Sequence, residues 1–399
     1  MTTCDVLVVG GGPAGSTCAE QLRAGGVDVL VVDKATFPRD KVCAGWITPA
    51  VVEQLSLDVD EYRRGRVFQA ITGFRTGVMG QPLVDTRYDR PVSFGILRRE
   101  FDHYLLVRSG ARVLEGTAVT RIERVPAGWQ VNGDITARLL VGAGGHFCPV
   151  ARWLNGPRRA EPIVAASEVE FALTAEQQAV CRVDPEQPEL YFCPDLKGYG
   201  WCFRKETTLN VGLGRQDRHR LTEHLQRFVR TLVSEGHLPP DLPTTWHGHA
   251  YLLNGSSPRA VADDGVVLVG DAAGLAYAQS GEGIRPAIES ALLAARAIIA
   301  AGADTRRAAL EPYRVALERR FGVDRQAGPG APTASPEPAP GLIGLFPEQL
   351  VQSLARRLMG TRWFTRRVVI DRWFLHAGVA PLASSRPFLG APREVAREL

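Results

Sequence analysis

Residues 5–33 of the chain, DVLVVGGGPAGSTCAEQLRAGGVDVLVVD, decide its fold. The stretch begins with a nearly unbroken apolar run, Asp5–Val9, which predicts a buried parallel strand. Three glycines at G-x-G-x-x-G spacing follow, and Ser16–Ala24 then predicts a helix. A second apolar run, Val27–Val32, predicts another buried strand. Strand, glycine-rich turn, helix and strand in this order are typical of the start of a Rossmann-type α/β domain.

Each glycine of the motif has a physical role. Gly10 permits a tight turn, Gly12 lets the backbone approach a pyrophosphate, and Gly15 lets the helix pack closely on the strand. The helix N-terminus presents free N–H groups and the positive end of its dipole to phosphates. Asp33, at the end of the second strand, stands where a carboxylate accepts hydrogen bonds from an adenosine ribose. The motif therefore predicts a site for FAD or NAD.

A second motif, far along the chain, favours FAD. Val266–Val269 predicts a further buried strand that leads into Asp271, and Gly281–Ile284 then opens a predicted helix that runs to about Ala301. NAD needs no second site so far downstream, whereas FAD extends beyond the pyrophosphate into a ribityl chain and a flavin ring. Asp271 can accept a hydrogen bond from the ribityl chain. The N-terminus of the helix can direct N–H groups at the part of the flavin that becomes negative on reduction.

A third predicted contact comes from Arg98, at the start of a helix whose apolar stripe includes Phe101 and Leu105. From that position Arg98 either reaches the cofactor phosphates or is an ordinary exposed arginine.

Composition excludes several classes of protein. The chain has 399 residues, of which 45% are hydrophobic and 23% charged, as in ordinary globular proteins. No apolar run approaches the roughly 20 residues of a membrane-spanning helix. No export signal is evident, so a cytoplasmic location is expected. Seven cysteines without a C-x-x-C pair argue against a disulfide framework and a zinc ribbon. The arginines form no nucleic-acid-binding module.

Several separated motifs carry a family resemblance. They are the glycine motif, Phe37–Gly45, Arg98 with Phe101-Asp102, Tyr199–Lys205 followed by Asn210–Gly214, and Gly270–Ile284. Over residues 1 to about 325, the chain resembles the flavoprotein family that contains geranylgeranyl reductases and, more distantly, aromatic hydroxylases and flavin-dependent halogenases. The resemblance implies a Rossmann-type FAD-binding domain that is interrupted by an antiparallel β-sheet substrate domain, with a helical C-terminal segment added.

The expected organisation is discontinuous. Residues 1–70, 96–154 and 258–325 are assigned to the FAD-binding domain, 71–95 and 155–257 to the substrate domain, 327–340 to a Pro- and Ala-rich linker, and 341–399 to the C-terminal segment. This last segment places aromatic residues among arginines. It is expected to form a lid on the substrate domain or, alternatively, a peripheral membrane contact.

The motifs and the resemblance together give the expected site residues. Those expected to bind FAD are Gly10, Gly12, Pro13, Ala14, Gly15, Asp33, Lys34, Lys41, Cys43, Ala44, Arg98, Asp271, Gly281, Gly283 and Ile284. By resemblance, Cys43 lies near the reactive face of the flavin, and Tyr199 and Trp201 line the substrate cavity. On the residues alone, Cys43 is either a catalytic thiol or a small buried apolar residue. Tyr199 and Trp201 are either cavity wall or core. No metal site is expected, because His247 and His249 lack further ligands.

The chain departs from the family pattern at four positions. Ala44 replaces a usual Gly, Arg204 and Ala278 each replace a Pro, and Gly144 stands where many relatives carry the Asp of Asp-Gly. That Asp helps to organise nicotinamide contacts in relatives. Either NAD(P)H or an electron-donor protein is therefore expected as a transient reductant.

We therefore expect an FAD-dependent oxidoreductase. The preferred reaction is reduction of a carbon–carbon double bond in a hydrophobic, polyprenyl-like substrate by hydride transfer from the flavin. One alternative is a monooxygenase that acts on a phenolic or polyketide substrate; a halogenase is less favoured because the Trp-x-Trp-x-Ile-Pro signature is absent. A second alternative is a flavin redox carrier without its own small substrate.

Overall fold

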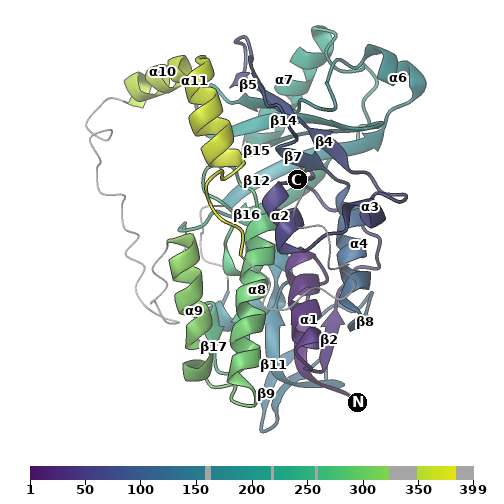
Figure 1. Cartoon of the computed structure of the whole chain (residues 1–399), viewed down its shortest axis with the longest axis vertical. Coiled ribbons are helices and arrows are strands. Elements are labelled where there is room, and N and C mark those ends of the chain that lie inside the picture. The colour runs from purple at the N-terminus through teal and green to yellow at the C-terminus, as the bar shows by residue number, and fades with distance from the viewer. Residues whose placement is uncertain (158–162, 217–219, 257–258, 323–347, 383–399) are drawn as a thin grey trace.

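The computed structural model describes residues 1–157, 163–216, 220–256, 259–322 and 348–382. Two sheets lie one above the other, as Figure 1 shows. The lower half carries the sheet that contains β1 (Thr2–Val9), and the upper half carries the sheet that contains β14 (Gly198–Lys205). Segments of the first 100 residues contribute to both halves, so the predicted interrupted arrangement of an FAD-binding domain and a substrate domain is present.

The lower sheet is a Rossmann-type sheet with β1 near its centre. Its strand order is β17-β18-β11-β1-β2-β8, and the pairs from β18 to β8 are parallel. The other strands are β2 (Val29–Val32), β8 (Arg112–Leu114), β11 (Ile135–Gly142), β17 (Ala262–Asp263) and β18 (Val266–Leu268), and β9 (Ile122–Val125) and β10 (Gly128–Val131) extend β11 as an antiparallel meander. The three apolar runs quoted from the sequence form β1, β2 and β18, because a central parallel strand buries both of its faces.

Helices cover this sheet. They are α1 (Pro13–Ala24), α4 (Arg98–Ser109), α5 (Pro149–Asn155), α8 (Ile284–Ala301) and α9 (Arg307–Phe321). Helix α1 packs against α8 and α4. It begins three residues earlier than its apolar pattern predicts, because Pro13 has the fixed φ that suits the first helical position.

The upper sheet has seven strands in the order β16-β12-β15-β14-β13-β5-β6. Besides β14 they are β5 (Gly73–Val78), β6 (Val84–Arg87), β12 (Ile163–Ala172), β13 (Glu189–Phe192), β15 (Thr208–Arg215) and β16 (His247–Leu252). All neighbours are antiparallel except β5 and β13, which pair in parallel. These two strands come from separate stretches of chain, so no hairpin fixes their relative direction. One face is covered by α7 (Leu221–Ser234), with α6 (Ala175–Val180) nearby, and the other faces the FAD-binding half.

A small connecting layer joins the two halves. It consists of β3 (Trp46–Ile47), β4 (Gln69–Ile71) and β7 (Ser93–Gly95), with α2 (Pro49–Gln54) and α3 (Val59–Tyr62). Two short 3-10 turns, η1 (Gly145–Phe147) and η3 (Gly270–Ala273), follow the carboxyl ends of strands β11 and β18.

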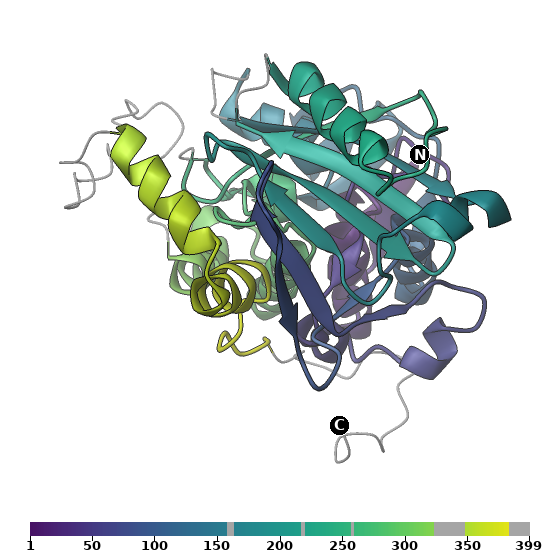
Figure 2. The same cartoon turned by 90° about the horizontal axis from the view of Figure 1, so that it is seen from above.

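The C-terminal segment is helical where it is described. It contains α10 (Glu348–Met359), α11 (Arg362–Phe364) and a π-helical stretch, η5 (Thr365–Phe374). In the view from above, these helices lie beside the edge of the upper sheet formed by β5 and β6 (Figure 2). Val369, Ile370 and Phe374 are buried in the same apolar cluster as Phe74 and Phe192. The linker predicted at 327–340 lies outside the described residues, and no described helix is long and apolar enough to cross a bilayer.

Candidate FAD and substrate site

The glycine loop between β1 and α1 is shaped by two glycines and open at a third. Gly10 has φ +115°, and a Cβ there would lie 2.5 Å from the carbonyl oxygen of Ala143. A Cβ on Gly15 would lie 1.8 Å from the carbonyl oxygen of Gly10. By contrast, a Cβ on Gly12 would meet only the flexible guanidinium of Arg39, at 3.4 Å, among the described residues. The loop thus leaves its backbone open at Gly12, where a phosphate group could approach.

The start of α1 is suited to an anion. Its N-cap residue, Gly12, has no capping side chain, the first turn contains no acidic residue, and Pro13 and Ala14 begin the helix. The dipole and N–H groups at this end are therefore not neutralised by a side chain of the helix. Asp33 accepts hydrogen bonds from the N–H groups of Gly11 (2.7 Å) and Ala35 (2.9 Å). Each carboxylate oxygen keeps a second lone pair for a ribose hydroxyl.

The second predicted motif comes together beside this loop. Asp271 lies in η3, and its Oδ1 would be 3.2 Å from a Cβ on Gly283, the N-cap residue of α8. His249 of β16 places Nε2 3.6 Å from Asp271 Oδ2, and Lys41 Nζ lies 3.0 Å from His249 Nδ1. A carboxylate, an imidazole, an ammonium group and the start of α8 therefore converge where the ribityl chain and flavin were predicted. Gly281 and Ile284 flank this helix start.

Charge in this cluster is tuned by burial and by neighbours. Burial, together with the positive charge of Arg98, lowers the pKa of Lys41 to about 8. Burial by itself would raise the pKa of Asp271, but the hydrogen bond from His249 and the charges of Lys41 and Arg98 hold it below its usual value. Asp271 therefore remains an ionised acceptor, as a ribityl contact requires.

Arg98 is buried rather than exposed. It is 8% exposed at the start of α4, and Nε and Nη2 each donate to a carboxylate oxygen of Asp102 at 2.8 Å. Arg39 also pairs with Asp102, at 3.2 Å. The Arg98 guanidinium faces the thiol of Cys43. Lys34, in contrast, is exposed after Asp33, and the structure does not bring it into this cluster.

Cys43 is fixed to the upper sheet through its own backbone. Its N–H donates to Oε1 of Glu168 (2.6 Å), and its carbonyl accepts from Nδ2 of Asn210 (3.2 Å). The thiol accepts a weak hydrogen bond from the N–H of Gly45 (3.4 Å) and is half-buried, as is the adjoining Ala44. Cys43 packs against the apolar cluster that contains Phe101 and lies at the meeting point of the two halves.

The two predicted aromatic residues have different surroundings. The hydroxyl of Tyr199 donates to the carbonyl of Ser280, immediately before Gly281. Tyr199 lines a cleft of about 110 Å³ whose wall also includes Phe192, Tyr251 and Ala278. The indole Nε1 of Trp201 instead donates to Oδ1 of Asn210 at 2.7 Å. Trp201 is buried and does not line this cleft, so it supports the wall from behind.

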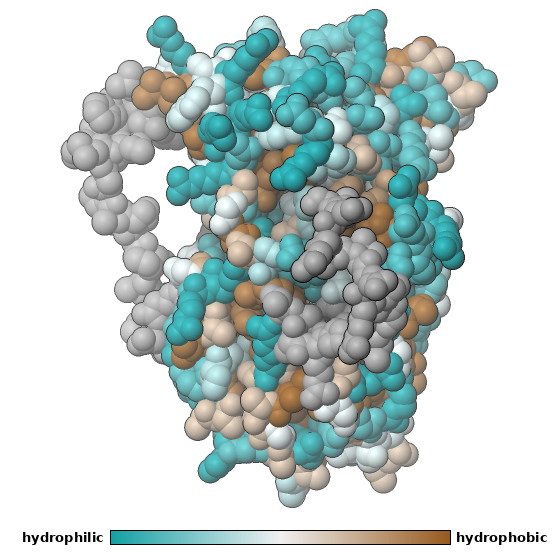
Figure 3. Space-filling model, in the orientation of Figure 1, coloured by the Kyte–Doolittle hydropathy of each residue, from teal (hydrophilic) through white to brown (hydrophobic). Residues whose placement is uncertain are grey.

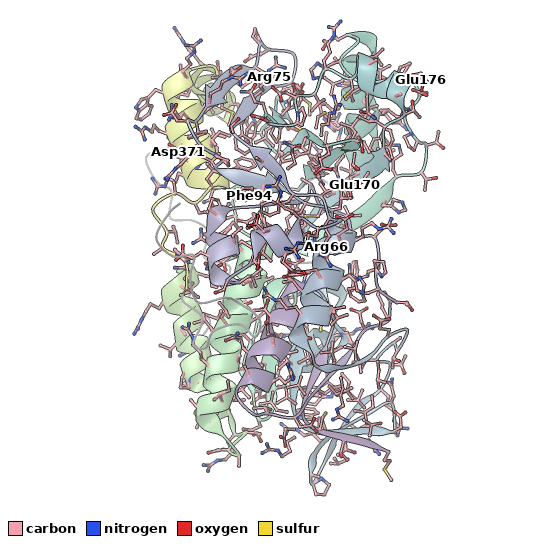
Figure 4. The ribbon with its side chains drawn as sticks, turned by 45° about the vertical axis from the view of Figure 1, so that its right-hand side comes forward. Arg66, Arg75, Phe94, Glu170, Glu176 and Asp371 are labelled. Atoms are coloured by element: carbon pink, nitrogen blue, oxygen red, sulfur yellow. The ribbon has the colours of Figure 1, made fainter. Side chains whose placement is uncertain are left out.

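Two residues of this site were not anticipated. Glu168 is 4% exposed on β12, and burial raises its pKa to about 7. Asn210 joins Cys43 and Trp201 to Glu170, the position of which is labelled in Figure 4. Glu170 in turn accepts a hydrogen bond from Lys205 at 2.6 Å. Strand alternation places such residues on one face, but only the pairing register brings them to Cys43.

The donor set fits FAD. The open backbone at Gly12 and the uncapped start of α1 suit a pyrophosphate. Asp33 and Asp271 follow β2 and β18 of the same sheet, where they suit the two sugar-like parts of FAD. Among the described residues, no group of three or more His, Cys, Asp or Glu side chains forms a potential metal site.

Known proteins share this sequence and architecture. A family model described as an FAD binding domain matches residues 3–70. Digeranylgeranylglycerophospholipid reductase 1 from Methanothermobacter thermautotrophicus is 28% identical over 327 residues, which cover 75% of this chain and 78% of that protein. Menaquinone reductase from Mycobacterium tuberculosis is 30% identical over 319 residues, which cover 73% of this chain and 76% of that protein.

Solved structures agree at the level of the fold. A geranylgeranyl bacteriochlorophyll reductase-like protein from Thermoplasma acidophilum superimposes with a TM-score of 0.69 and 22% identity, covering 98% of this chain and 96% of that chain. The halogenase PltM superimposes with a TM-score of 0.63 and 16% identity, covering 80% and 74% of the two chains. The sequence relatives, rather than the solved structures, identify the family. Because of their sequence identity and the share of the chain that they cover, the chain belongs to the geranylgeranyl reductase-like family of FAD-dependent oxidoreductases.

Proposed function

We propose that this protein reduces a carbon–carbon double bond in the prenyl chain of a lipid-like substrate. The observation that carries the proposal is an aromatic-walled cleft, with Phe192, Tyr199 and Tyr251, that opens directly beside Gly281 at the predicted flavin site. The names of the relatives support it, since digeranylgeranylglycerophospholipids and menaquinone both carry prenyl chains.

Different residues of the chain would bind the cofactor and position the substrate. FAD, when bound, supplies the hydride that one alkene carbon receives. The open backbone at Gly12 and the start of α1 would hold its pyrophosphate, Asp33 its ribose, and Asp271 its ribityl chain. The aromatic wall would exclude water and hold the alkene against the cofactor.

The other alkene carbon needs a proton, so that two hydrogens are added in all. Burial raises the pKa of Tyr199 well above its usual value, so its hydroxyl stays protonated and continues to bond Ser280. We propose Cys43 as the group that holds the proton near the alkene, because its thiol is half-buried at the junction of the two halves. Two electrons would come from a reductant that binds transiently, either NAD(P)H or a donor protein, since the sequence has no second G-x-G-x-x-G unit.

Product analysis tests this proposal. The holoenzyme, dithionite and a geranylgeranyl compound are incubated without oxygen, and the lipid is examined by mass spectrometry. A product heavier by two hydrogens is expected. Conversion of a phenol to an oxygenated product under air, with the prenyl compound unchanged, would instead establish the monooxygenase. Reoxidation of the flavin by a protein acceptor alone would establish the carrier.

We further propose that the C-terminal segment contacts an anionic membrane surface from which such a lipid is drawn. Trp363 is 70% exposed and Leu354 57% exposed. The surrounding exposed cations are Arg357, Arg362, Arg366, Arg367 and Arg372. Hydrophilic and hydrophobic residues are interleaved over this upper part of the molecule (Figure 3). Exposed aromatic and cationic side chains in one patch suit a headgroup layer.

Vesicle sedimentation tests this surface. A variant with Arg362→Glu and Arg366→Glu is expected to lose most binding to vesicles that contain phosphatidylglycerol, because each arginine near such a surface contributes about 1 kcal/mol. The matched control carries Arg63→Glu and Arg64→Glu, which are also exposed but follow α3 on another part of the molecule. Equal losses in both variants, or no binding of the parent protein, would reject the membrane contact.

A further inference from the structure

The C-terminal segment supplies an aromatic ring to the substrate side of the upper sheet. Phe374, the last residue of η5, is 1% exposed. Its ring centroid lies 5.4 Å from Tyr199, 6.3 Å from Phe192 and 6.0 Å from Trp46. Tyr199 and Phe192 line the cleft, and Trp46 follows Cys43 by three residues. Phe374 therefore fills the space between the cleft and the Cys43 segment.

Polar contacts hold this ring from both sides. Before it in the chain, Oδ1 of Asp371 accepts a hydrogen bond from the hydroxyl of Tyr88 at 2.6 Å (Figure 4). After it, Nη2 of Arg285 donates to the carbonyl of Val379 at 2.7 Å. Arg285 is 1% exposed on α8 and is itself paired with Glu289 at 2.9 Å. The position of the ring is therefore fixed by both halves of the molecule.

The cleft whose wall residues Tyr199 and Phe192 contact this ring is small. Its volume is about 110 Å³, whereas pockets for small molecules are typically about 300–1,000 Å³. Phe374 does not itself line the cleft; with Trp46, Phe74 and Phe203 it belongs to the buried aromatic cluster that also contains the cleft residue Phe192. A prenyl chain that extends past Tyr199 into this cluster would meet the Phe374 ring first.

We propose that Phe374 is a specificity-determining residue that closes the end of the prenyl cavity from behind its wall residues Tyr199 and Phe192. It sets how many isoprene units fit on the far side of the double bond that is reduced. The inference rests on the proposed prenyl reductase function and adds the residue that limits the length of the prenyl substrate.

Binding of chains that cannot be reduced tests it apart from catalysis. Saturated isoprenoid alcohols with two and with four isoprene units are titrated into the holoenzyme, and tryptophan fluorescence is followed because Trp46 and Trp201 lie in the same cluster. In Phe374→Ala, affinity for the longer alcohol relative to the shorter is expected to rise at least about tenfold, since one or more extra apolar groups gain space. The ratio of kcat/KM for the matching unsaturated alcohols should shift in the same direction.

Two further variants keep the test decisive. Phe374→Leu retains an apolar side chain and is expected to give an intermediate ratio, and it decides the matter should the alanine variant not fold. Phe364→Ala is the matched control, because Phe364 lies on the same segment but contacts Trp373 edge to face at 6.1 Å. In this control, the ratio of the affinities for the longer and the shorter alcohol should stay within about twofold of the parent value. Removal of a side chain that limits the pocket would change this ratio much more.

The failures of the two proposals are distinguishable. A parent enzyme that reduces prenyl compounds, with unchanged chain-length ratios in both Phe374 variants, overturns the end-wall inference alone. A parent enzyme that neither binds nor reduces any prenyl compound overturns both.

Discussion

Gly12 and Gly15 belong to one sequence motif, but they face different neighbours. Gly12 has ordinary extended dihedral angles (φ −74°, ψ −173°), and an added Cβ would meet only a flexible arginine tip among the described residues. Gly12→Ala should therefore leave the stability of the apoprotein within about 0.5 kcal/mol of the parent. It should weaken FAD at least tenfold, about 1.4 kcal/mol, because the methyl group stands where the pyrophosphate approaches. Flavin fluorescence titration and thermal unfolding measure the two effects.

Gly15→Ala is the matched comparison. Its Cβ would lie 1.8 Å from the backbone oxygen of Gly10, so strand and helix must separate and the apoprotein itself should lose stability. Normal FAD affinity in Gly12→Ala would show that the phosphates bind elsewhere.

Glu168 gives a prediction about pH. Burial raises its pKa to about 7, whereas an unfolded glutamate titrates near its ordinary value of 4.5. Between these two values the folded state binds the extra proton, so the free energy of unfolding falls as pH rises, by up to about 1.4 kcal/mol per pH unit for one such group. Its contribution is complete below pH 4.5 and is lost as pH passes about 7. Glu168→Gln keeps an acceptor for the N–H of Cys43 and removes the titration, so this fall should become shallower.

Urea unfolding at the two ends of that window measures the effect. Burial also raises the pKa values of Glu20 and Glu282 to about 7, so a shallower slope rather than a flat one is expected. Glu176→Gln is the control, at an exposed position on α6 (Figure 4). Hydrogen bonds lower the pKa of Glu176 below 4.5, so its loss should leave the parent slope above that pH unchanged. A Glu168→Gln slope equal to that of the parent would mean that Glu168 is ionised throughout.

At the scale of elements, a hydrogen bond to Tyr88 adds to the apolar packing that attaches η5 to the upper sheet. Tyr88 follows β6, and its hydroxyl donates to Asp371. Tyr88→Phe should weaken the attachment of η5 by about 1.5–3 kcal/mol, the usual contribution of a hydrogen bond to a charged group. Hydrogen exchange of residues 365–374 should accelerate about tenfold or more, as measured by mass spectrometry.

A similar tyrosine provides the control. Tyr104 donates to Glu61 at 2.6 Å on another side of the molecule. Tyr104→Phe should leave exchange in η5 as in the parent. Equal acceleration in both variants would place the effect in global stability rather than in the attachment of η5.

The sequence predicts local elements better than their pairing. Strands β1, β2 and β18 and helices α1 and α8 follow from periodicity and glycine spacing, because these signals lie within about 30 residues. The parallel pairing of β5 with β13 cannot be predicted in this way, since nothing in the sequence of either strand encodes the direction of its partner. The burial of Phe374 is likewise set by residues about 180 to 330 positions away, Phe192 and Trp46 among them, and periodicity carries no such information.

The same limit applies to the site. The expected FAD contacts at Gly12, Asp33 and Asp271 come from motifs that carry their own context. Glu168 and Asn210 reach Cys43 only through the register of β12, β15 and β14. In a strand of alternating polar and apolar residues, the sequence does not distinguish a buried glutamate such as Glu168 from one that is exposed to solvent.

At the scale of the whole molecule, the two halves meet at the Cys43 segment. The FAD-binding half presents Arg98 and Asp271, the upper sheet holds Cys43 by Glu168 and Asn210, and the C-terminal segment closes the aromatic side. An enzyme that brings a flavin and a long apolar chain together needs this arrangement of polar groups on one side and an aromatic wall on the other.

A stopped-flow experiment tests whether the reduced flavin passes its electrons to a prenyl double bond. The holoenzyme is reduced with one equivalent of dithionite without oxygen and mixed in a stopped-flow instrument with a geranylgeranyl compound, while flavin absorbance is followed. Full reoxidation of the flavin is expected, with one double bond reduced per flavin. A flavin that stays reduced until air is admitted, with the prenyl compound unchanged, would contradict the proposed reduction.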